Sequence, residues 1–269
     1  MSIVKHAPML TLEEAANLAE RLYGARGTLR PLPSERDQNF LLDAGEARYV
    51  LKIANAMEER ALLVAQNEAM ARAAGLRLLP QIIRSTRGEE IEEALSNGEK
   101  HFIRLIAYLD GTPMGDVKRH SSELLYDLGD KLGRLGRILQ RFDAPVLHRR
   151  FHWDLAHGLE VIRANCNLLR DATLRRMVSQ LTVNFEKYTF PLLSRLRTSV
   201  VYHDANDNNV LVGGGADIYS SDQTVTGFID LGDMTHSYTV SDLAVAIAYA
   251  ILNKPNPLET AANITKGYH

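Results

Sequence analysis

A change in the spacing of apolar residues near residue 110 constrains the fold of this chain more than any other feature. Before it, short strand-like runs predominate, and after it apolar residues recur at the three- and four-residue spacing of amphipathic helices. The turn-rich stretch 110–113 separates the two patterns. We therefore expect an α+β fold of two unequal lobes, formed by residues 1–109 and 110–269.

The first lobe is expected to be a small antiparallel sheet with one or two helices. Thr11 and Glu14 have the spacing of a capping box, which predicts a helix that ends before Gly24. Strand-like runs at 39–42 and 49–53 flank a turn signal and predict a β-hairpin. The other elements expected here are a helix over 58–74 that ends at Gly75, strands over 78–83 and 101–109, and an acidic loop over 88–99.

The second lobe is expected to be mostly helical. Its helices are predicted over 121–141, 153–170 and 173–197, then from residue 240 through the apolar run 243–252, and again near residue 257. Short strands are predicted at 200–201, 210–212 and 225–229. Gly129, Gly133 and Gly136 fall in one of these helices, where small residues let a neighbouring backbone approach closely. We interpret them as packing positions.

Charge and apolar content exclude several classes of function. The chain has 31 Lys and Arg against 33 Asp and Glu, so it has no excess of positive charge for a nucleic-acid partner. Its longest apolar run spans residues 243–252, well short of the roughly 20 residues of a membrane span. The N-terminus lacks a signal-peptide pattern. A cytoplasmic protein without a membrane or nucleic-acid partner is expected.

The polar segment between the strands at 200–201 and 210–212 is the most informative part of the chain. Asp204 lies five residues before Asn209, which is the offset of the base and the metal-binding Asn in the catalytic loop of protein kinases. In that role the Asp accepts the proton of the attacking hydroxyl and holds its oxygen in line. Asn and Asp also favour ordinary turns, so the pair alone is a weak signal.

The strands that follow strengthen the kinase interpretation. Asn209 precedes the run 210–212, and Asp230 follows the run 225–229. If these strands pair antiparallel, Asn209 and Asp230 meet at one edge. An amide oxygen beside a carboxylate suits Mg²⁺, which takes its other ligands from water and phosphates. The sequence therefore predicts a site for phosphoryl transfer.

A kinase also needs a cation for the nucleotide phosphates. Lys52 lies in the strand 49–53, and Glu68 on the following helix is predicted to form an ion pair with it. The ordinary alternative for each is a solvated surface side chain. No Gly-rich phosphate motif occurs, so the loop 31–39 is the candidate lid. There Ser34 could offer a hydroxyl and Arg36 a charge, or both could belong to a surface turn.

These residues resemble the aminoglycoside phosphotransferase and choline kinase superfamily, whose fold is similar to that of protein kinases. The motifs at 34–40, 204–210 and 229–234 look most like the hydroxylysine kinase group, which includes kinase-like domains fused to class III aminotransferases. The resemblance therefore allows fusion to further domains in a longer polypeptide. It implies the following roles: Lys52 and Glu68 at the nucleotide phosphates, Ser34 in the phosphate loop, Asp204 as catalytic base, and Asn209 and Asp230 as metal ligands.

The function expected is Mg²⁺-dependent transfer of the γ-phosphoryl of ATP or GTP to the hydroxyl of an amino alcohol or hydroxy amino acid. Asp207, Asp233 and His236 lie near the predicted metal edge, where an anionic rim would suit a substrate ammonium, although each could equally be a turn residue. Asp242, which begins the helix at 243–252, is interpreted as a cap or a loop brace.

Two departures from the family pattern favour an alternative, a non-catalytic nucleotide-binding domain. Tyr202 stands where the family usually has His two positions before the catalytic Asp. In the resembling group, the motif at 267–269 is followed by further helices, so we expect the second lobe to be incomplete.

Overall fold

The computed structural model describes residues 6–214 and 222–269, which form two compact units. Unit 1 contains the described residues through Thr112 together with Leu211–Gly213 and Thr226–Ile229. Unit 2 contains Pro113–Val210, Asp230–His269 and the described part of 214–225. The predicted lobes 1–109 and 110–269 did not include the two later segments in unit 1. Their place there follows from hydrogen bonds to unit 1, because Phe228 N donates to Leu78 O and Thr226 Oγ1 to Asp110 O, each at 2.7 Å.

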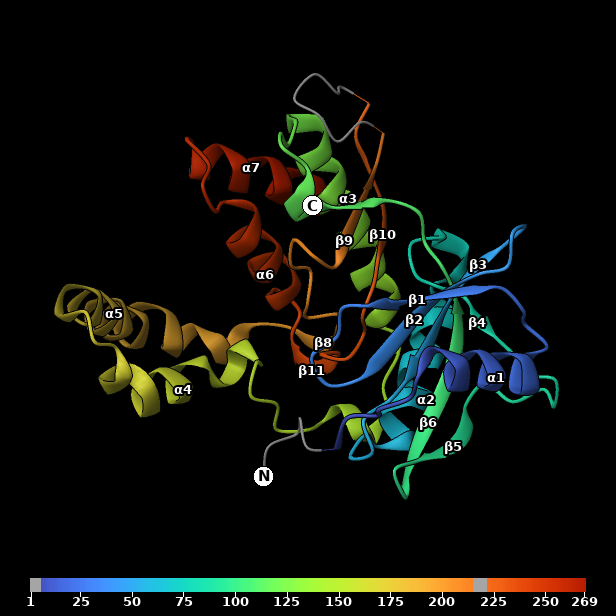
Figure 1. Cartoon of the computed structure of the whole chain (residues 1–269). Coiled ribbons are helices and arrows are strands. Elements are labelled where there is room, and N and C mark those ends of the chain that lie inside the picture. The colour runs from blue at the N-terminus through green and yellow to red at the C-terminus, as the bar shows by residue number, and fades with distance from the viewer. Residues whose placement is uncertain (1–5, 215–221) are drawn as a thin grey trace. The chain divides into compact units, whose positions relative to one another are not determined.

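Unit 1 is an antiparallel sheet with the strand order β1-β2-β3-β6-β4, to which β5 adds by pairing with β6 (Figure 1). Its elements are α1 (Leu12–Tyr23), β1 (Thr28–Leu32), β2 (Gln38–Asp43), β3 (Arg48–Ile53), α2 (Arg60–Arg72), β4 (Ile82–Ile83), β5 (Glu92–Ser96) and β6 (Glu99–Ala107).

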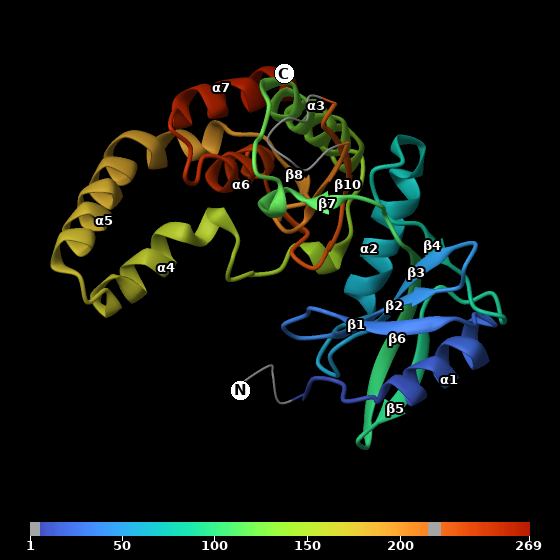
Figure 2. The same cartoon turned by 45° about the horizontal axis from the view of Figure 1, so that its top comes forward.

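The predicted capping box and hairpin of unit 1 are confirmed. Thr11 N donates to Glu14 Oε2 at 2.7 Å, Glu14 N donates to Thr11 Oγ1 at 3.2 Å, and Gly24 ends α1 with a φ of 63°. The buried face of α1 packs on one face of the sheet, and α2 lies on the other side (Figure 2). The core on the α1 side contains Ala15, Leu18, Ala19 and Leu22 of α1 and Phe40, Leu42, Leu51, Ile53, Ile103 and Leu105 of the sheet.

Three secondary-structure predictions for unit 1 are wrong, and one of them is the strand over 78–83, which is strand only at Ile82–Ile83. The predicted acidic loop 88–99 contains β5, in which Glu92 is only 1% exposed and forms an ion pair with Arg87. The ion pair compensates for burial of the Glu92 carboxylate in the strand. The acidic composition of this segment suggested a loop and concealed the strand. Gly75 does not end α2, because the backbone continues into a short 3₁₀ turn and Arg77 takes the left-handed conformation instead, with a φ of 55°.

Unit 2 is mostly helical, and the predicted α+β class with a helical second lobe is confirmed. The remaining elements of the chain are β7 (Thr112–Pro113), α3 (Ser122–Leu139), α4 (Gly158–Asn165), α5 (Ala172–Asn184), β8 (Thr198–Val201), β9 (Val210–Gly213), β10 (Thr224–Phe228), β11 (Thr235–Tyr238), α6 (Ser241–Ala250) and α7 (Pro257–Tyr268). Most of β9 and the end of β10 belong to unit 1, as stated above. Strands β10, β9 and β7 form one sheet in that order, and β11 pairs with β8. Strand β11 was not expected from the sequence.

Glycines hold α3 and α7 in close contact, as the sequence predicted for α3. A Cβ on Gly129 would lie 2.0 Å from Ile264 O, and one on Gly133 would lie 2.8 Å from Tyr268 O. The reciprocal residue on α7 is Gly267, where a Cβ would lie 1.9 Å from Tyr126 O. Any larger side chain at these positions would push the two helices apart.

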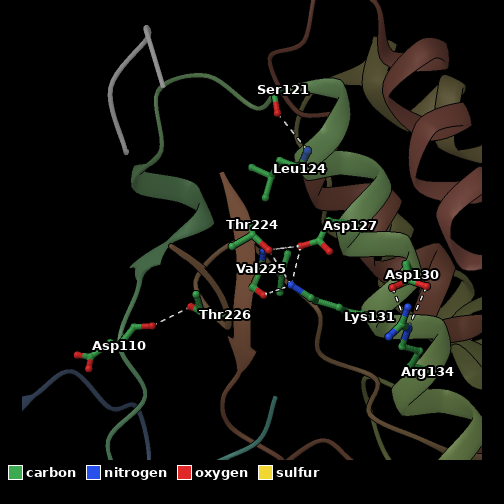
Figure 3. Close-up of polar contacts among 10 residues, drawn as sticks. All are labelled: Asp110, Ser121, Leu124, Asp127, Asp130, Lys131, Arg134, Thr224, Val225 and Thr226. Atoms are coloured by element: carbon green, nitrogen blue, oxygen red, sulfur yellow. Dashed lines mark hydrogen bonds and ion pairs between the residues drawn. The ribbon is translucent and has the colours of Figure 1, made fainter. Parts of the chain in front are cut away.

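Polar contacts fasten α3 to the start of β10 (Figure 3). Asp127 Oδ2 accepts hydrogen bonds from Val225 N at 2.7 Å and from Thr224 Oγ1 at 2.8 Å. Lys131 Nζ donates to the same carboxylate oxygen at 2.8 Å and to Val225 O at 2.6 Å. This network fixes the strand that leads toward Asp230.

The helical pair α4–α5 is built differently from the rest of unit 2. The helices predicted over 153–170 and 173–197 are shorter than expected, and neither α4 nor α5 has a buried residue. A π turn at Phe185–Thr189 and a 3₁₀ helix at Phe190–Arg195 follow α5. Apolar side chains are exposed here, including Leu168 at 74% and Leu181 at 65%. Without buried positions, the apolar spacing does not mark the helix ends.

Within the described parts of the chain, no helix combines the length and the apolar composition required to cross a bilayer.

Candidate active site

The loop between β8 and β9 is shaped by the side chain of Asn206. Its Oδ1 accepts hydrogen bonds from Asn208 N at 2.8 Å and from Asn209 N at 3.1 Å, which closes an Asx turn. The backbone of Asn206 accepts from Val210 N at 3.1 Å, where β9 begins. Hydrogen bonds among the loop's own residues therefore stabilise its conformation.

The carboxylate of Asp204 is oriented by two amides of the same loop. Asn206 Nδ2 donates to Asp204 Oδ1, and Asn209 Nδ2 donates to Asp204 Oδ2, each at 2.6 Å. The structure thus brings together the Asp204 and Asn209 that the sequence singled out. Because both carboxylate oxygens are held, the side chain has a fixed direction from which to receive a proton.

The environment of Asp204 raises its pKa to about 7. Burial makes the largest contribution, followed by the negative charge of Asp233, while Asp230 adds a smaller one. The hydrogen bonds from Asn206 and Asn209 act in the opposite direction. A carboxyl group with a pKa near neutrality is suited to accepting and releasing a proton at physiological pH.

Asp230 lies in a turn that the structure holds at several points. Its φ is 57°, and its Oδ1 accepts a hydrogen bond from Gly232 N at 3.0 Å. Arg149 Nη2 donates to Gly232 O at 2.7 Å and to Met234 O at 3.2 Å, so a residue far from the motif anchors this turn. As predicted, β9 and β10 are neighbours in one sheet.

The candidate substrate residues do not all gather at Asp204. The negative charge of Asp233 raises the pKa of the Asp204 carboxyl, as described above. Asp207 lies against the turn at Met114–Asp116, where its carbonyl accepts from Gly115 N at 2.8 Å. His236 stacks on His148 with ring centroids 4.2 Å apart. The stacked position points to a packing contribution from His236.

Tyr249 on α6 is a polar residue of this region that the sequence did not indicate. Burial and the charges of Asp204, Asp207 and Asp233, in that order, raise the pKa of its hydroxyl. The side chain is 41% exposed. Its phenol therefore lies in the field of three carboxylates while remaining open to solvent. Because Tyr249 falls in an apolar helical run, its neighbours in the sequence gave no signal.

Asp242 braces the backbone just before Asp204, which confirms one of the two roles expected for it. Asp242 Oδ1 accepts a hydrogen bond from His203 N at 2.6 Å, and Oδ2 accepts from Tyr202 N at 3.3 Å. It does not cap α6 through its side chain. Burial raises the pKa of Asp242 to about 6, against the opposing effect of these hydrogen bonds.

Tyr202, which stands where the family usually has His, is buried inside unit 2. Tyr202 is 1% exposed, and burial raises the pKa of its hydroxyl well above the usual value. The adjoining His203 has a φ of 68°, and its ring lies 3.1 Å from Trp153 O through Nε2. The catalytic-loop backbone is thus supported on both sides although the family His is absent.

In unit 1, Lys52 lies on β3 as predicted, but the predicted ion pair with Glu68 is not found. Glu68 is on the exposed face of α2, where its Oε1 accepts from Arg72 Nη2 at 2.6 Å. Among the described residues no hydrogen bond or ion pair reaches Lys52. The helical spacing predicted α2 but assigned Glu68 to the wrong face.

The loop with Ser34 and Arg36 is folded on itself and tied to the end of β3. Ser34 Oγ accepts a hydrogen bond from Asp37 N at 3.2 Å. Asn55, which is 3% exposed, donates from Nδ2 to Arg36 O at 3.1 Å, and its backbone N donates to Asp37 Oδ1 at 3.0 Å. Asn55 is a second residue that the sequence did not indicate, and it joins this loop to the strand of Lys52.

Oxygen ligands are present in unit 2, although the part of the chain that is described has no group of three or more His, Cys, Asp or Glu side chains arranged to hold a metal ion. The negative charges of Asp230 and Asp233 at Asp204 are a physical sign that a cation would be favoured there. Asn209 and Asp230 offer the hard oxygen donors that Mg²⁺ prefers.

Comparison with known proteins agrees with this chemistry. Residues 28–269 match the model of the phosphotransferase enzyme family. The chain is 27% identical over 282 residues to hydroxylysine kinase of Xenopus laevis and 28% identical over 288 residues to that of Mus musculus. These alignments cover 97% of this chain and 75% and 74% of the two relatives.

Solved structures show the same fold at lower identity. A microcompartment-associated aminopropanol kinase superposes with a TM-score of 0.70 at 18% identity, covering 96% of this chain and 80% of that one. An amicoumacin kinase superposes with a TM-score of 0.69 at 14% identity, covering 96% and 77%. The match to the family model covers most of the sequence. The chain therefore belongs to the phosphotransferase enzyme family, and it is a kinase that phosphorylates a hydroxyl group of a small molecule.

Proposed function

We propose that this kinase transfers the γ-phosphoryl group of ATP or GTP to the hydroxyl of an amino alcohol or hydroxy amino acid, with 5-hydroxylysine as the leading candidate. The observation that carries the proposal is the Asp204 carboxylate, which two amides hold in one direction and which has a pKa of about 7. The names of the relatives support the choice of acceptor.

Asp204 is the proposed catalytic base. It would accept the proton of the acceptor hydroxyl as that oxygen attacks the γ-phosphorus, and would hold the oxygen in line with the bond that breaks. Asn206 and Asn209 keep its two oxygens from rotating. Asp242 keeps the preceding backbone in place.

Asn209 and Asp230 are the proposed ligands of Mg²⁺. When bound there, Mg²⁺ would supply positive charge that reduces the repulsion between the nucleotide phosphates and the attacking oxygen. Asn209 would then have two tasks, because its amide nitrogen holds Asp204 and its amide oxygen remains for the metal.

Unit 1 would supply groups for the nucleotide phosphates. Lys52 is the proposed cation, and the backbone of the loop with Ser34 and Arg36 would contribute amide donors. The bond of Ser34 Oγ to Asp37 N and the anchor from Asn55 favour a preformed loop. Such a loop loses little conformational entropy when it binds phosphate.

The acceptor is expected to carry an ammonium group. Asp207 and Asp233 are carboxylates that act electrostatically on Tyr249 together with Asp204. A positively charged substrate would be attracted to such a group of side chains. We retain Asp207 and Asp233 as candidate substrate residues, and His236 is the weaker candidate because of its stacking on His148.

A nucleoside-diphosphate release assay with Mg²⁺ tests the proposal. The acceptor panel is 5-hydroxylysine, ethanolamine, homoserine and an aminoglycoside, with lysine as the matched compound that lacks the hydroxyl. We expect release with 5-hydroxylysine and none with lysine. Nucleotide binding without release for any hydroxyl compound would contradict the proposed acceptor class and favour a non-catalytic domain.

The variant Asp204→Asn tests the assigned base. It should bind MgATP as the wild type does, while kcat falls by about 10²- to 10⁴-fold, the usual contribution of a positioned acid or base. Isothermal titration and steady-state rates measure the two quantities separately. Wild-type turnover in this variant would refute the role of Asp204.

A further inference from the structure

Three polar residues form a row across the sheet of unit 1, on the face that α2 covers. Lys52 of β3 lies directly opposite Asn39 of β2 and directly opposite Arg104 of β6. Side chains at opposed antiparallel positions lie on the same face, with Cβ atoms about 5 Å apart. Adjacent residues such as Phe40 and Leu51 point to the other face and join the core against α1. A polar row thus occupies a position where a sheet usually packs apolar side chains on a helix.

Arg104 is fixed in this row by α2. Its Nη1 donates to Asn67 Oδ1 and its Nη2 to Gln66 Oε1, each at 2.8 Å. All three residues are buried, with exposures of 5% for Arg104, 3% for Asn67 and 4% for Gln66. Two hydrogen bonds in a planar fork leave the guanidinium little freedom to move.

Lys52 and Asn39 contrast with Arg104, because neither side chain is anchored. Among the described residues nothing forms an ion pair or hydrogen bond with Lys52, and Glu68 is engaged with Arg72. Asn39 Oδ1 is buried and accepts no hydrogen bond in the described part of the chain. A buried acceptor without a donor costs free energy, which a nearby donor would recover.

These facts give the Lys52 ammonium a preferred direction. Like charges at opposed strand positions repel each other. Since Arg104 is anchored and Lys52 is not, this repulsion favours a position of the ammonium on the Asn39 side. An ammonium has three donors, so one bond to Asn39 Oδ1 leaves two for phosphate oxygens.

We propose that Arg104 and Asn39 are positioning residues for Lys52, and that together they direct its ammonium toward a nucleoside polyphosphate in place of a helix glutamate. The inference rests on the proposed function, in which Lys52 binds the nucleotide phosphates. Gln66 and Asn67 act one step further away, because they keep the arginine in its position.

The test compares binding of MgATP, MgGTP and adenosine by isothermal titration to five variants of the full chain. Arg104→Met should weaken binding of the preferred triphosphate by about tenfold or more, because the repulsion that directs the Lys52 ammonium toward the phosphates is lost. Adenosine binding should change less than twofold, because adenosine has no phosphate. Arg104→Lys keeps the charge and should recover part of the loss, and Asn39→Leu should weaken triphosphate binding by about fivefold.

Two further variants complete the comparison. Arg30→Met is the matched control, since it removes an exposed arginine from β1 of the same sheet, and it should bind all three ligands as the wild type does. Glu68→Gln should have a smaller effect on triphosphate binding than Arg104→Met. A larger effect from Glu68→Gln would overturn the inference and would support Glu68 as the partner of Lys52.

The outcomes separate this inference from the function on which it rests. If the wild-type chain binds neither triphosphate, the proposed function fails. If it binds one, and Arg104→Met and Asn39→Leu match the control, the inference fails. Equal losses for triphosphate and adenosine, or equal losses in Arg104→Met and Arg104→Lys, would show a packing role and also overturn it. Should Arg104→Met not fold by circular dichroism, unchanged triphosphate binding in Asn39→Leu refutes the inference.

Discussion

The catalytic loop of unit 2 and the polar row of unit 1 hold their charged groups by different means. In the loop, Asp204 is held by Asn206 and Asn209, which lie two and five residues away in the sequence. In the row, Lys52 has as neighbours Asn39 and Arg104, which come from other strands. The first arrangement is a property of a short segment, and the second exists only after the sheet has formed. We therefore expect single substitutions to affect the loop more severely than the row.

The largest effect is expected for Asn209→Ala. This change removes the donor to Asp204 Oδ2 and the proposed metal ligand, so kcat should fall by about 10²-fold or more. Asn208→Ala is the matched control, because Asn208 is exposed and its side chain donates to Asp207 Oδ1 at 3.5 Å and not to Asp204. Steady-state rates with the accepted substrate measure both. Similar rates for the two variants would contradict the role assigned to the Asn209 side chain in the loop.

An intermediate effect, which depends on pH, is expected for Asp242→Asn. Since the pKa of Asp242 is raised to about 6 in the folded state, the native protein binds a proton that the unfolded chain releases near pH 4. The stabilising contribution is full below pH 4 and is lost as pH rises to 6, amounting to about 3 kcal/mol. The Asn variant should lack this slope. Urea unfolding at several pH values measures it, and parallel curves for the two proteins would contradict the prediction.

The smallest effect is expected for Asn55→Ala in unit 1. The variant loses the bond to Arg36 O and the acceptor for Met57 N but keeps the backbone donor to Asp37, so the loop remains partly anchored. The KM for the nucleotide should rise about threefold, consistent with the loss of about 0.7 kcal/mol, while kcat stays near the wild-type value. If instead kcat fell as far as in Asn209→Ala, the loop of unit 1 would be as critical as the catalytic loop.

The sequence predicted those features that depend on neighbouring residues. Thr11 and Glu14 specify the start of α1 by themselves, and Asp204 and Asn209 are close enough that their spacing fixes their contact. Asp242 also gave a usable signal, because an acidic residue at the start of an apolar helix has few roles. Its two bonds to the catalytic loop span about 40 positions, and only the fold reveals where they end.

What the sequence did not predict depends on which face a residue occupies. Glu68 and Gln66 are two positions apart on α2, and the apolar spacing does not distinguish the exposed side from the side that contacts Arg104. Glu92 looked like a loop residue because its partner Arg87 could not be identified from the sequence. Arg104 itself lies within a strand of apolar residues. Its role could not be predicted without the strand register, which places it opposite Lys52.

The helical pair α4–α5 has a consequence for how this chain can vary. Since neither helix has a buried residue, substitutions there remove few packed contacts and should change the free energy of unfolding by only about 0.5 kcal/mol each. Gly129 and Gly267, in contrast, admit no larger side chain. Substitutions could therefore accumulate in α4 and α5 during evolution while α3, α7 and the catalytic loop remain unchanged. Diversity within the family is expected to accumulate there first.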